Sequence, residues 1–243
     1  METKNCLILA AGLGSRIANL AKSKPLLEVA GKPLIHHVLE GAKKAGLENF
    51  YVVSGYNGHI LRSFLDYYSG MTDTNIIHVI NDDWESPNGM SVLAAEKYLQ
   101  DHFCLLMSDH LFDPTILSDL NKLPINDQDV VLAVDDNLDN KFVTLDDVTR
   151  VKTKDNAILD IGKEISDYNG YDTGIFKCSK NLFAALKTAG EAGDKSLTGG
   201  IRQLIKTDNA KCYNINKRIW IDVDDEAVME MAIKNFPFAG KVL

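Results

Sequence analysis

The chain has 243 residues, of which 45% are hydrophobic and 25% are charged, which predicts one globular α/β domain over residues 1–243 with a full core. Twenty-six Lys and Arg against 34 Asp and Glu give a formal net charge of -8, which argues against nucleic acid or an anionic membrane as a partner. The cysteines form no C-x-x-C pair, and the apolar run 6–11 is too short for a signal peptide core or a membrane span. We therefore expect a cytoplasmic protein with no membrane span.

Short β-rich runs alternate with amphipathic stretches through the first half of the chain, a pattern typical of βαβ units. The expected strands lie at residues 6–10, 50–54, 76–80, 103–107 and 130–134. The expected helices lie at residues 33–45, 57–68 and 89–99, and after Asp113-Pro114, where an N-cap residue precedes a proline. These elements predict a doubly wound, mostly parallel sheet that binds its ligands beyond the carboxyl ends of the strands.

The pattern weakens from Asp135 onward. Residues 144–151 and 157–161 have the composition of short strands separated by turns, which predicts a smaller antiparallel insertion. We expect this insertion to form a substrate-side lobe over about residues 135–175. Residues 175–178 and 211–215 are expected to return to the sheet, and residues 224–235 to form an amphipathic terminal helix.

A glycine turn follows the first expected strand. Gly12 and Gly14 would let backbone N–H groups approach a polyphosphate, and Arg16 and Lys24 would add positive charge. Position 17 is Ile, where a dinucleotide loop has its third glycine, and no G-K-[ST] follows. The turn predicts a phosphate loop of neither the NAD nor the Walker A kind, while a plain βα turn with a solvent-facing Arg stays open as the alternative.

Acidic residues follow two apolar segments that lie far apart in the sequence. Asp109 comes after the expected strand 103–107, and Asp222 and Asp224 follow Trp220-Ile221. Because Mg²⁺ keeps waters and uses phosphate oxygens, two protein carboxylates suffice for a site. Turn or capping chemistry for Asp109, and favourable charge at a helix N-terminus for residues 222–225, are the alternatives.

The whole phrase over residues 9–16, with Lys24-Pro25-Leu26 and residues 31–34, resembles the signature of the sugar-phosphate nucleotidyltransferase superfamily. The resemblance implies that Arg16 meets the β- and γ-phosphates of an NTP, that Lys24 lies against the α-phosphate and the incoming phosphate, and that both are catalytic with Asp109. It also implies a Mg²⁺ site at Asp109 and Asp222, with Asp224 sharing or replacing Asp222. The loop that wraps the nucleotide would consist of Leu9, Ala10, Ala11, Gly12, Gly14, Ser15, Arg16 and Lys24.

Five further phrases, at residues 84–91, 107–110, 161–164, 171–174 and 220–224, together resemble the CTP:inositol-1-phosphate cytidylyltransferases. The resemblance spans residues 7–232 and implies that CTP and inositol 1-phosphate give CDP-inositol and pyrophosphate. In many members of that family this domain precedes a membrane-embedded transferase. We expect a free-standing version or an excised domain here, with a homo-oligomer or a partner membrane transferase both open.

The same resemblance suggests a base side and an acceptor side. Asn88, Gly89 and Ser91 would face the base, although an Asn-Gly turn ahead of a helix explains that dipeptide equally well. The acceptor side is expected to consist of His110, Lys163, Asp172 and Thr173.

Other acceptors stay open as alternatives. Tyr168 and Tyr171 keep phosphocholine open, because aromatic faces suit a trimethylammonium group. 2-Aminoethylphosphonate and hexose 1-phosphates are further acceptors for the same chemistry. A non-catalytic sensor or assembly subunit is the alternative from another class.

Overall fold

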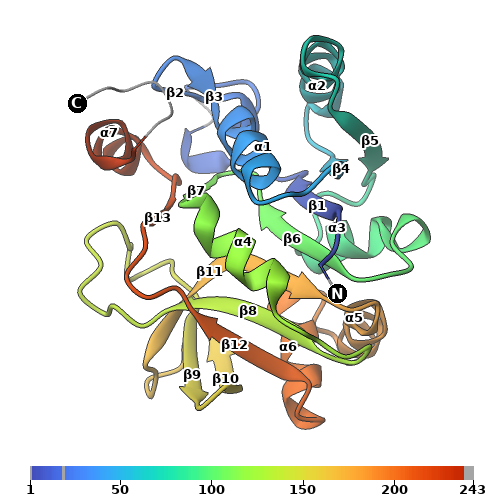
Figure 1. Cartoon of the computed structure of the whole chain (residues 1–243), viewed down its shortest axis with the longest axis vertical. Helices are drawn as coiled ribbons and strands as arrows, with labels where there is room; N and C mark the ends of the chain where they lie inside the picture. The colour runs from blue at the N-terminus through green and yellow to red at the C-terminus, as the bar shows by residue number, and fades with distance from the viewer. Residues whose placement is uncertain (1, 18–19, 238–243) are drawn as a thin grey trace.

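A computed structural model describes residues 2–17 and 20–237, so residues 1, 18–19 and 238–243 of the expected domain lie outside the described residues. Its centre is a nine-stranded sheet in the order β5-β4-β1-β6-β11-β8-β12-β10-β9 (Figure 1). The strands are β1 (Asn5–Ala10), β4 (Asn49–Ser54), β5 (Asn75–Ile80), β6 (Phe103–Met107), β8 (Val130–Asp135), β9 (Arg150–Lys154), β10 (Ala157–Gly162), β11 (Gly170–Cys178) and β12 (Ala210–Asn214). Two small antiparallel pairs accompany it: β2 (Glu28–Val29) with β3 (Lys32–Pro33), and β7 (His110–Phe112) with β13 (Trp220–Asp222).

Most strands of the main sheet run in one direction, as the sequence predicts. β5, β4, β1 and β6 run parallel to one another, and β8 pairs parallel with β12. β11 lies between β6 and β8 and is antiparallel to both. Because two antiparallel pairings restore the original direction, the carboxyl ends of β1, β6 and β8 meet at one edge of the sheet.

Helices cover both faces of the sheet (Figure 1). They are α1 (Leu34–Lys44), α2 (Gly58–Thr72), α3 (Gly89–Ala94), α4 (Pro114–Lys122), α5 (Asn181–Glu191), α6 (Leu197–Lys206) and α7 (Glu226–Asn235). Alternate residues of β1 enter two different core clusters. Cys6 and Ile8 pack with α1, α2 and α4, whereas Leu7 and Leu9 pack with α3, α5 and α6. The sequence of β1 is therefore almost continuously apolar, because both faces of the strand are buried.

The expected antiparallel insertion is present as the β9–β10 hairpin. It continues the main sheet, because β10 also pairs with β12 and β9 with β11. The predicted strand over residues 144–151 is wrong for most of its length. The Thr144 carbonyl accepts hydrogen bonds from the N–H groups of Asp147 and Val148, both at 3.0 Å, so this stretch turns and β9 begins at Arg150.

Helix boundaries differ from the sequence predictions at α2, which extends to Thr72, at α3 and at α7. α3 ends at Ala94 because the N–H of Ala95 bonds the carbonyl of Val92 three residues back, and a 3₁₀ turn follows at Glu96–Tyr98. α7 begins at Glu226, since the Asp225 side chain accepts from the N–H of Val228 and so caps the helix. α5 and α6 were not predicted at all. The Asp113 cap and Pro114 start of α4 are confirmed. Among the described residues, no helix has the length and apolar run needed to cross a membrane.

Candidate active site

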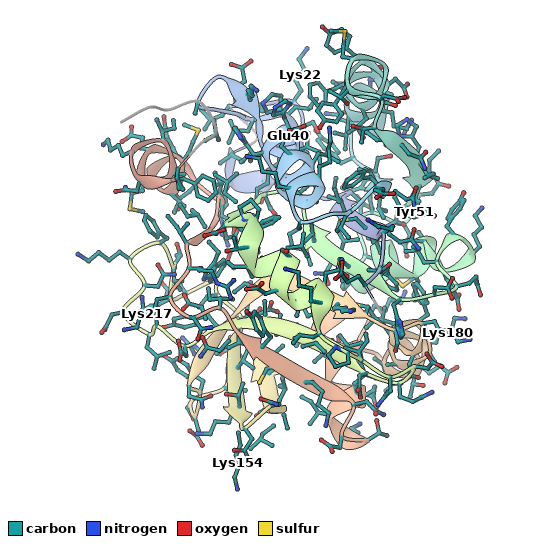
Figure 2. All side chains as sticks on the ribbon, viewed as in Figure 1. Lys22, Glu40, Tyr51, Lys154, Lys180 and Lys217 are labelled. Atoms are coloured by element: carbon teal, nitrogen blue, oxygen red, sulfur yellow. The ribbon has the colours of Figure 1, made fainter. Side chains whose placement is uncertain are left out.

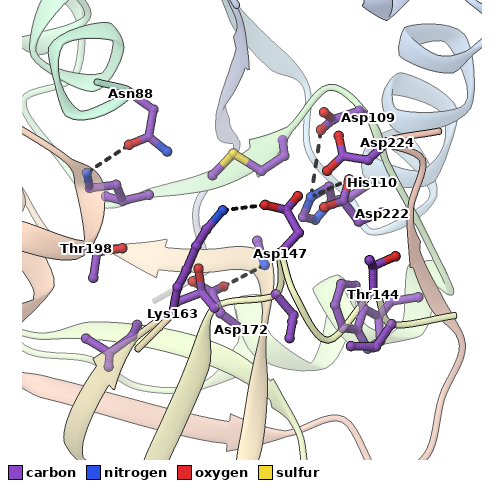
Figure 3. Close-up of a pocket in the computed structure, with 18 of the residues that line it drawn as sticks. Asn88, Asp109, His110, Thr144, Asp147, Lys163, Asp172, Thr198, Asp222 and Asp224 are labelled. Atoms are coloured by element: carbon purple, nitrogen blue, oxygen red, sulfur yellow. Dashed lines mark hydrogen bonds and ion pairs between the residues drawn. The ribbon is translucent and has the colours of Figure 1, made fainter. Parts of the chain in front are cut away.

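Seven of the predicted site residues line a cavity of about 280 Å³ at the carboxyl edge of the sheet, and Lys24 and Arg16 contact carboxylates of its lining (Figure 3). The cavity wall combines segments from β6, β10, β11 and β13, together with the loop between β8 and β9. Its titratable lining residues are Asp109, His110, Asp147, Lys163, Asp172, Asp222 and Asp224. Asp147 is the member of this set that the sequence did not indicate.

The glycine turn after β1 brings Lys24 close to the backbone. Gly14 has φ +63°, and a Cβ built there would lie 2.6 Å from Cβ of Lys24. Glycine is therefore required at this position both for its conformation and for the close approach. Gly12 is exposed and has open space around it, which leaves room for a ligand against its backbone.

The other residues of the predicted nucleotide loop fall into two groups. The side chains of Leu9, Ala10 and Ala11 are buried in the core, and the carbonyls of Leu9 and Ala11 accept hydrogen bonds from Ser108 and Tyr56 N–H groups. Their predicted contact with a nucleotide would therefore come from the remaining backbone groups. Ser15 and Arg16 lie in an exposed 3₁₀ turn.

Lys24 lies between two carboxylates from distant parts of the chain. Its Nζ forms ion pairs with Asp109, in the turn after β6, and with Asp224, just after β13. Burial lowers the pKa of the Lys24 ammonium, but Asp109, Asp222 and Asp224 outweigh this effect and raise that pKa above its ordinary value. Lys24 is thus held as a cation.

Arg16 connects Asp224 with Asp147, which lies in the loop between β8 and β9. Its Nη1 lies 3.1 Å from Asp224 and 2.7 Å from Asp147, and Asp147 in turn lies 2.5 Å from Nζ of Lys163. The hydrogen bond from Arg16 to Asp147 holds the pKa of that carboxyl well below its usual range. Asp147 has no local sequence signal, because it occupies a turn that the sequence suggests is a strand.

The β7–β13 pair assembles the predicted metal ligands. Asp222 lies opposite His110 in the antiparallel register, and the N–H of Val223 bonds the carbonyl of Asp109 at 3.1 Å. Two groups of side chains have ligand atoms within 4.8 Å of one another: Asp109, His110 and Asp222, and Asp147, Asp222 and Asp224. Oδ1 of Asp222 is buried and makes no hydrogen bond with the described residues, and Nε2 of His110 lies 3.3 Å from it as an ion-pair partner. This carboxylate oxygen and its acidic neighbours fit a hard divalent cation, which prefers oxygen ligands.

His110 is engaged on both ring nitrogens. Nδ1 lies 2.7 Å from the carbonyl oxygen of Thr173, and Nε2 lies 3.3 Å from Asp222. Burial lowers the pKa of His110, but Asp222 and then Asp109 raise it, to about 10 overall. Because both nitrogens face acceptors, the structure favours an imidazolium that orients Asp222.

The predicted acceptor-side residues differ in whether their side chains line the cavity. Lys163 and Asp172 line the cavity, and burial raises the pKa of Asp172 to about 6, while its Oδ1 accepts from the N–H of Gly174 at 2.7 Å. The Thr173 side chain is fully buried, and its hydroxyl donates to the carbonyl of Ala133 at 2.8 Å. Thr173 therefore contributes to the site through its backbone contact with His110. Its predicted role in substrate binding stays a prediction.

Each of the predicted base-side residues has a structural role that does not involve a base. Asn88 lines the cavity and accepts from the N–H of Leu197 at 2.9 Å (Figure 3). A Cβ at Gly89 would lie 2.4 Å from the carbonyl oxygen of Lys195, so the glycine permits close packing of α3 on the segment before α6. The buried Ser91 hydroxyl accepts from Asn81 Nδ2 at 3.0 Å. Contact of these residues with a base stays a prediction.

The charge at the cavity contrasts with the charge elsewhere on the molecule. Lys154, Lys180 and Lys217 are exposed and project outward from separate parts of the periphery (Figure 2). The side chain of Lys24, by comparison, is 10% exposed. Lys24 is therefore a largely buried cation at the carboxyl edge of the sheet, where the carboxylates of the cavity lining surround it.

The glycine turn, the buried Lys24 and the carboxylates lie at the carboxyl edge of a mostly parallel sheet, where ligands bind in open α/β folds. The MobA-like NTP transferase domain family matches residues 6–209, and the chain belongs to that family. It is therefore an enzyme of the nucleotidyltransferase kind. This confirms the class that the sequence predicted.

Curated relatives narrow the comparison. The chain is 27% identical over 235 residues to "Bifunctional IPC transferase and DIPP synthase" of Aquifex aeolicus, which covers 95% of this chain and 51% of that protein. The protein of the same name from Rubrobacter xylanophilus is 29% identical over 228 residues, covering 93% and 47%. "Bifunctional protein GlmU" of Methanococcus maripaludis is 28% identical over 228 residues, covering 90% and 51%. The chain thus spans about half the length of these relatives.

Solved structures share the fold. The inositol-1-phosphate CTP transferase from T. maritima superposes with a TM-score of 0.83 at 22% identity, covering 98% of this chain and all of that one. A UDP-glucose pyrophosphorylase complexed with UDP-glucose has a TM-score of 0.79 at 20% identity, covering 95% and 97%. The nucleotidyltransferase fold is confirmed.

Proposed function

We propose that this domain transfers CMP from CTP to inositol 1-phosphate, giving CDP-inositol and pyrophosphate in a Mg²⁺-dependent reaction. The observation that carries the proposal is the buried Lys24 between Asp109 and Asp224, two carboxylates that line the same cavity as Lys163. Two anionic substrates need separated cations, and a divalent metal needs the carboxylates. The relatives named for IPC transferase and inositol-1-phosphate CTP transferase support the choice of nucleotide and acceptor.

The proposed chemistry is a single in-line displacement. An acceptor phosphate oxygen forms a bond to the α-phosphorus of CTP, the bond from that phosphorus to the α–β bridging oxygen breaks, and pyrophosphate leaves with the electron pair. A phosphate monoester is largely ionised at neutral pH, so no general base is needed. The enzyme must instead bring two anions together and offset the charge of the transferring group.

Residues of this chain supply that compensation. Lys24 would contact the α-phosphate and the incoming phosphate, and Arg16 would contact the outer phosphates. Asp109, Asp222 and Asp224 would hold Mg²⁺, which when bound neutralises phosphate charge. His110 fixes the orientation of Asp222. In the structure Lys24 and Arg16 contact the same carboxylates that would bind the metal, so ligand binding requires an exchange of ion-pair partners.

The cavity wall supports a hydroxyl-bearing acceptor. Thr144, Thr149, Thr198 and Asp172 line it and offer hydrogen-bonding groups to a polyol. The tyrosines that suggested phosphocholine are placed elsewhere. Tyr171 is buried, with its hydroxyl 3.3 Å from the Leu138 carbonyl, and neither Tyr168 nor Tyr171 belongs to the cavity lining.

A pyrophosphate-release screen that crosses four NTPs with a panel of phosphorylated acceptors tests the proposal. We expect CTP with inositol 1-phosphate to give the highest rate. A site built to hydrogen-bond hydroxyls discriminates against an acceptor that lacks them by roughly 10⁴-fold. A phosphocholine rate equal to that of inositol 1-phosphate would disprove the acceptor assignment, and a preference for UTP or dTTP would disprove the nucleotide assignment.

A further inference from the structure

Asp147 joins two cations that come from different halves of the site. Its Oδ2 lies 2.7 Å from Arg16, in the turn after β1, and its Oδ1 lies 2.5 Å from Lys163, just after β10. Figure 3 shows Lys163 and Asp147 pointing toward each other across the cavity. The two carboxylate oxygens therefore bridge the proposed nucleotide side and the proposed acceptor side.

Asp147 belongs to a loop, residues 136–149, that crosses the cavity between β8 and β9. The start of this crossing loop is held by the buried carboxylate of Asp135, which accepts from Nε1 of Trp220 at 2.8 Å and from Nδ2 of Asn140 at 2.7 Å. Near its other end, Arg150 donates to the carbonyl of Leu145 at 3.2 Å. Between these points, Phe142 packs against the small apolar cluster of Ile17 and Leu34. The ends are fixed by hydrogen bonds within the lobe and by Trp220, whereas Asp147 contacts ligand-binding cations.

A substrate phosphate would compete with the Asp147 carboxylate for Arg16 and Lys163. Under the proposed function, Arg16 contacts the phosphates of CTP and Lys163 contacts the acceptor, and both side chains are 53% exposed and accessible to ligands. A phosphate that takes either cation removes one partner of Asp147 and places negative charge beside it. The substrate that binds first must displace the Asp147 carboxylate, which weakens its binding. The second substrate then meets a cation that Asp147 no longer holds, so it binds more tightly.

We propose that Asp147 is a positioning residue that couples the two substrates: it holds Arg16 and Lys163 in the ligand-free enzyme, so binding of one substrate strengthens binding of the other. This inference rests on the proposed function, because it needs both sites to bind phosphates. Coupling of this kind is reciprocal, so each substrate raises the affinity of the other by the same factor. Because the paired cations are half exposed, we expect a factor of about three to ten.

Calorimetry with substrates that cannot react tests the coupling without turnover. α,β-Methylene CTP with Mg²⁺ serves as the nucleotide probe, since the bond that would break is replaced, and its affinity is measured with and without saturating inositol 1-phosphate. In the unmodified enzyme, the acceptor should tighten probe binding about three- to tenfold. In Asp147→Asn, the probe alone should bind more tightly than in the unmodified enzyme, and the acceptor should change its affinity less than about twofold.

Two further variants separate coupling from general charge and from folding. Asp146→Asn removes the same charge from a neighbouring exposed carboxylate that makes no ion pair with the described residues, and it should couple like the unmodified enzyme. Asp147→Glu keeps the charge and should retain most of the coupling. Thermal unfolding of all three shows whether each is folded.

The outcomes distinguish the inference from the proposed function. If the unmodified enzyme binds neither probe nor inositol 1-phosphate, the proposed function fails and this inference fails with it. If it binds both without coupling, or if folded Asp147→Asn couples as strongly as the unmodified enzyme, only the coupling role of Asp147 is wrong. Weaker probe binding by folded Asp147→Asn in the absence of acceptor would also contradict it.

Discussion

The proposed nucleotide side and the proposed acceptor side of the site hold their lysines in different ways. Lys24 is 10% exposed, packs against Gly14 and lies between Asp109 and Asp224. Lys163 is 53% exposed, and its ion pair is with the single carboxylate of Asp147. The charge of Lys24 is therefore largely buried between two carboxylates, whereas Lys163 is more exposed and depends on a carboxylate from a loop. Loops positioned by a rigid scaffold commonly carry the part of a site that varies between relatives.

The difference in burial between Lys24 and Lys163 suggests different roles in the reaction. Fixed, water-poor charge is most effective where the transition state gains charge, which is at the transferring phosphoryl group. A more exposed lysine mainly supplies binding. We therefore expect substitutions on the nucleotide side to lower kcat and substitutions on the acceptor side to raise KM.

The largest effect is expected from Asp109→Ala. This change removes a proposed metal ligand and one of the two carboxylates on Lys24, so turnover should fall on the order of a hundredfold or more without unfolding the protein. Steady-state rates across a Mg²⁺ titration, with circular dichroism as the folding check, measure it. Asp222→Ala and Asp224→Ala made in parallel rank the other two candidate ligands. Near-normal turnover in folded Asp109→Ala would remove Asp109 from the metal site.

Lys24→Met should have the next largest effect. Methionine keeps much of the side-chain length but removes the charge, so the rate should fall roughly tenfold to a hundredfold even at saturating substrates. Separate kcat and KM values for CTP decide the point. A variant with unchanged kcat and a raised KM would make Lys24 a binding residue, and the contrast between the two sides would be lost.

Lys163→Met should act mainly on the acceptor. We expect its KM for inositol 1-phosphate to rise about tenfold while kcat and the KM for CTP change much less. Lys152→Met is the matched control, because Lys152 lies in the same lobe, pairs with Asp167 and does not line the cavity. An equal loss in kcat from Lys163→Met would show that the acceptor side also contributes to the transition state.

The smallest effect concerns stability at Asp172. Its carboxyl pKa, raised to about 6 by burial, means that the folded state disfavours the ionised form. Folding stability is therefore lost as pH rises from the ordinary carboxyl pKa through about 6. Asp172→Asn should be more stable than the unmodified protein by about 1 kcal/mol at about pH 7.5, and the difference should shrink near about pH 4. Thermal unfolding at the two pH values measures this, and a difference independent of pH would contradict the assigned burial.

Asp172→Asn also sharpens the comparison between the two sides. If Asp172 hydrogen-bonds an acceptor hydroxyl, the stabilised variant should bind inositol 1-phosphate less tightly while the affinity for CTP stays the same. Such a result would show a trade-off at Asp172 between folding stability and acceptor binding.

Much of the nucleotide side could be predicted from the sequence because it is local. The strand at residues 6–10, the glycine turn and Lys24 lie within 20 residues of one another, and their close contact depends on backbone conformation that glycine alone permits easily. Asp109 and Asp222 were also indicated, because Asp109 follows an apolar strand and Asp222 ends another. The sheet class followed from the alternation of strands and helices, which depends on local periodicity.

The acceptor side was decided by tertiary structure. Asp147 meets Arg16 over a separation of 131 residues, and neither local propensity nor a motif distinguishes it from the adjacent Asp146. The buried hydroxyls of Ser91 and Thr173 look equally available in the sequence, yet packing commits them to Asn81 and to the Ala133 carbonyl. Buried polar groups must find partners, and which partner is in reach depends on the assembled fold. The sequence by itself therefore determined the glycine turn, the strand-end carboxylates and the sheet class, and only the tertiary structure decided that Asp147 bridges Arg16 and Lys163.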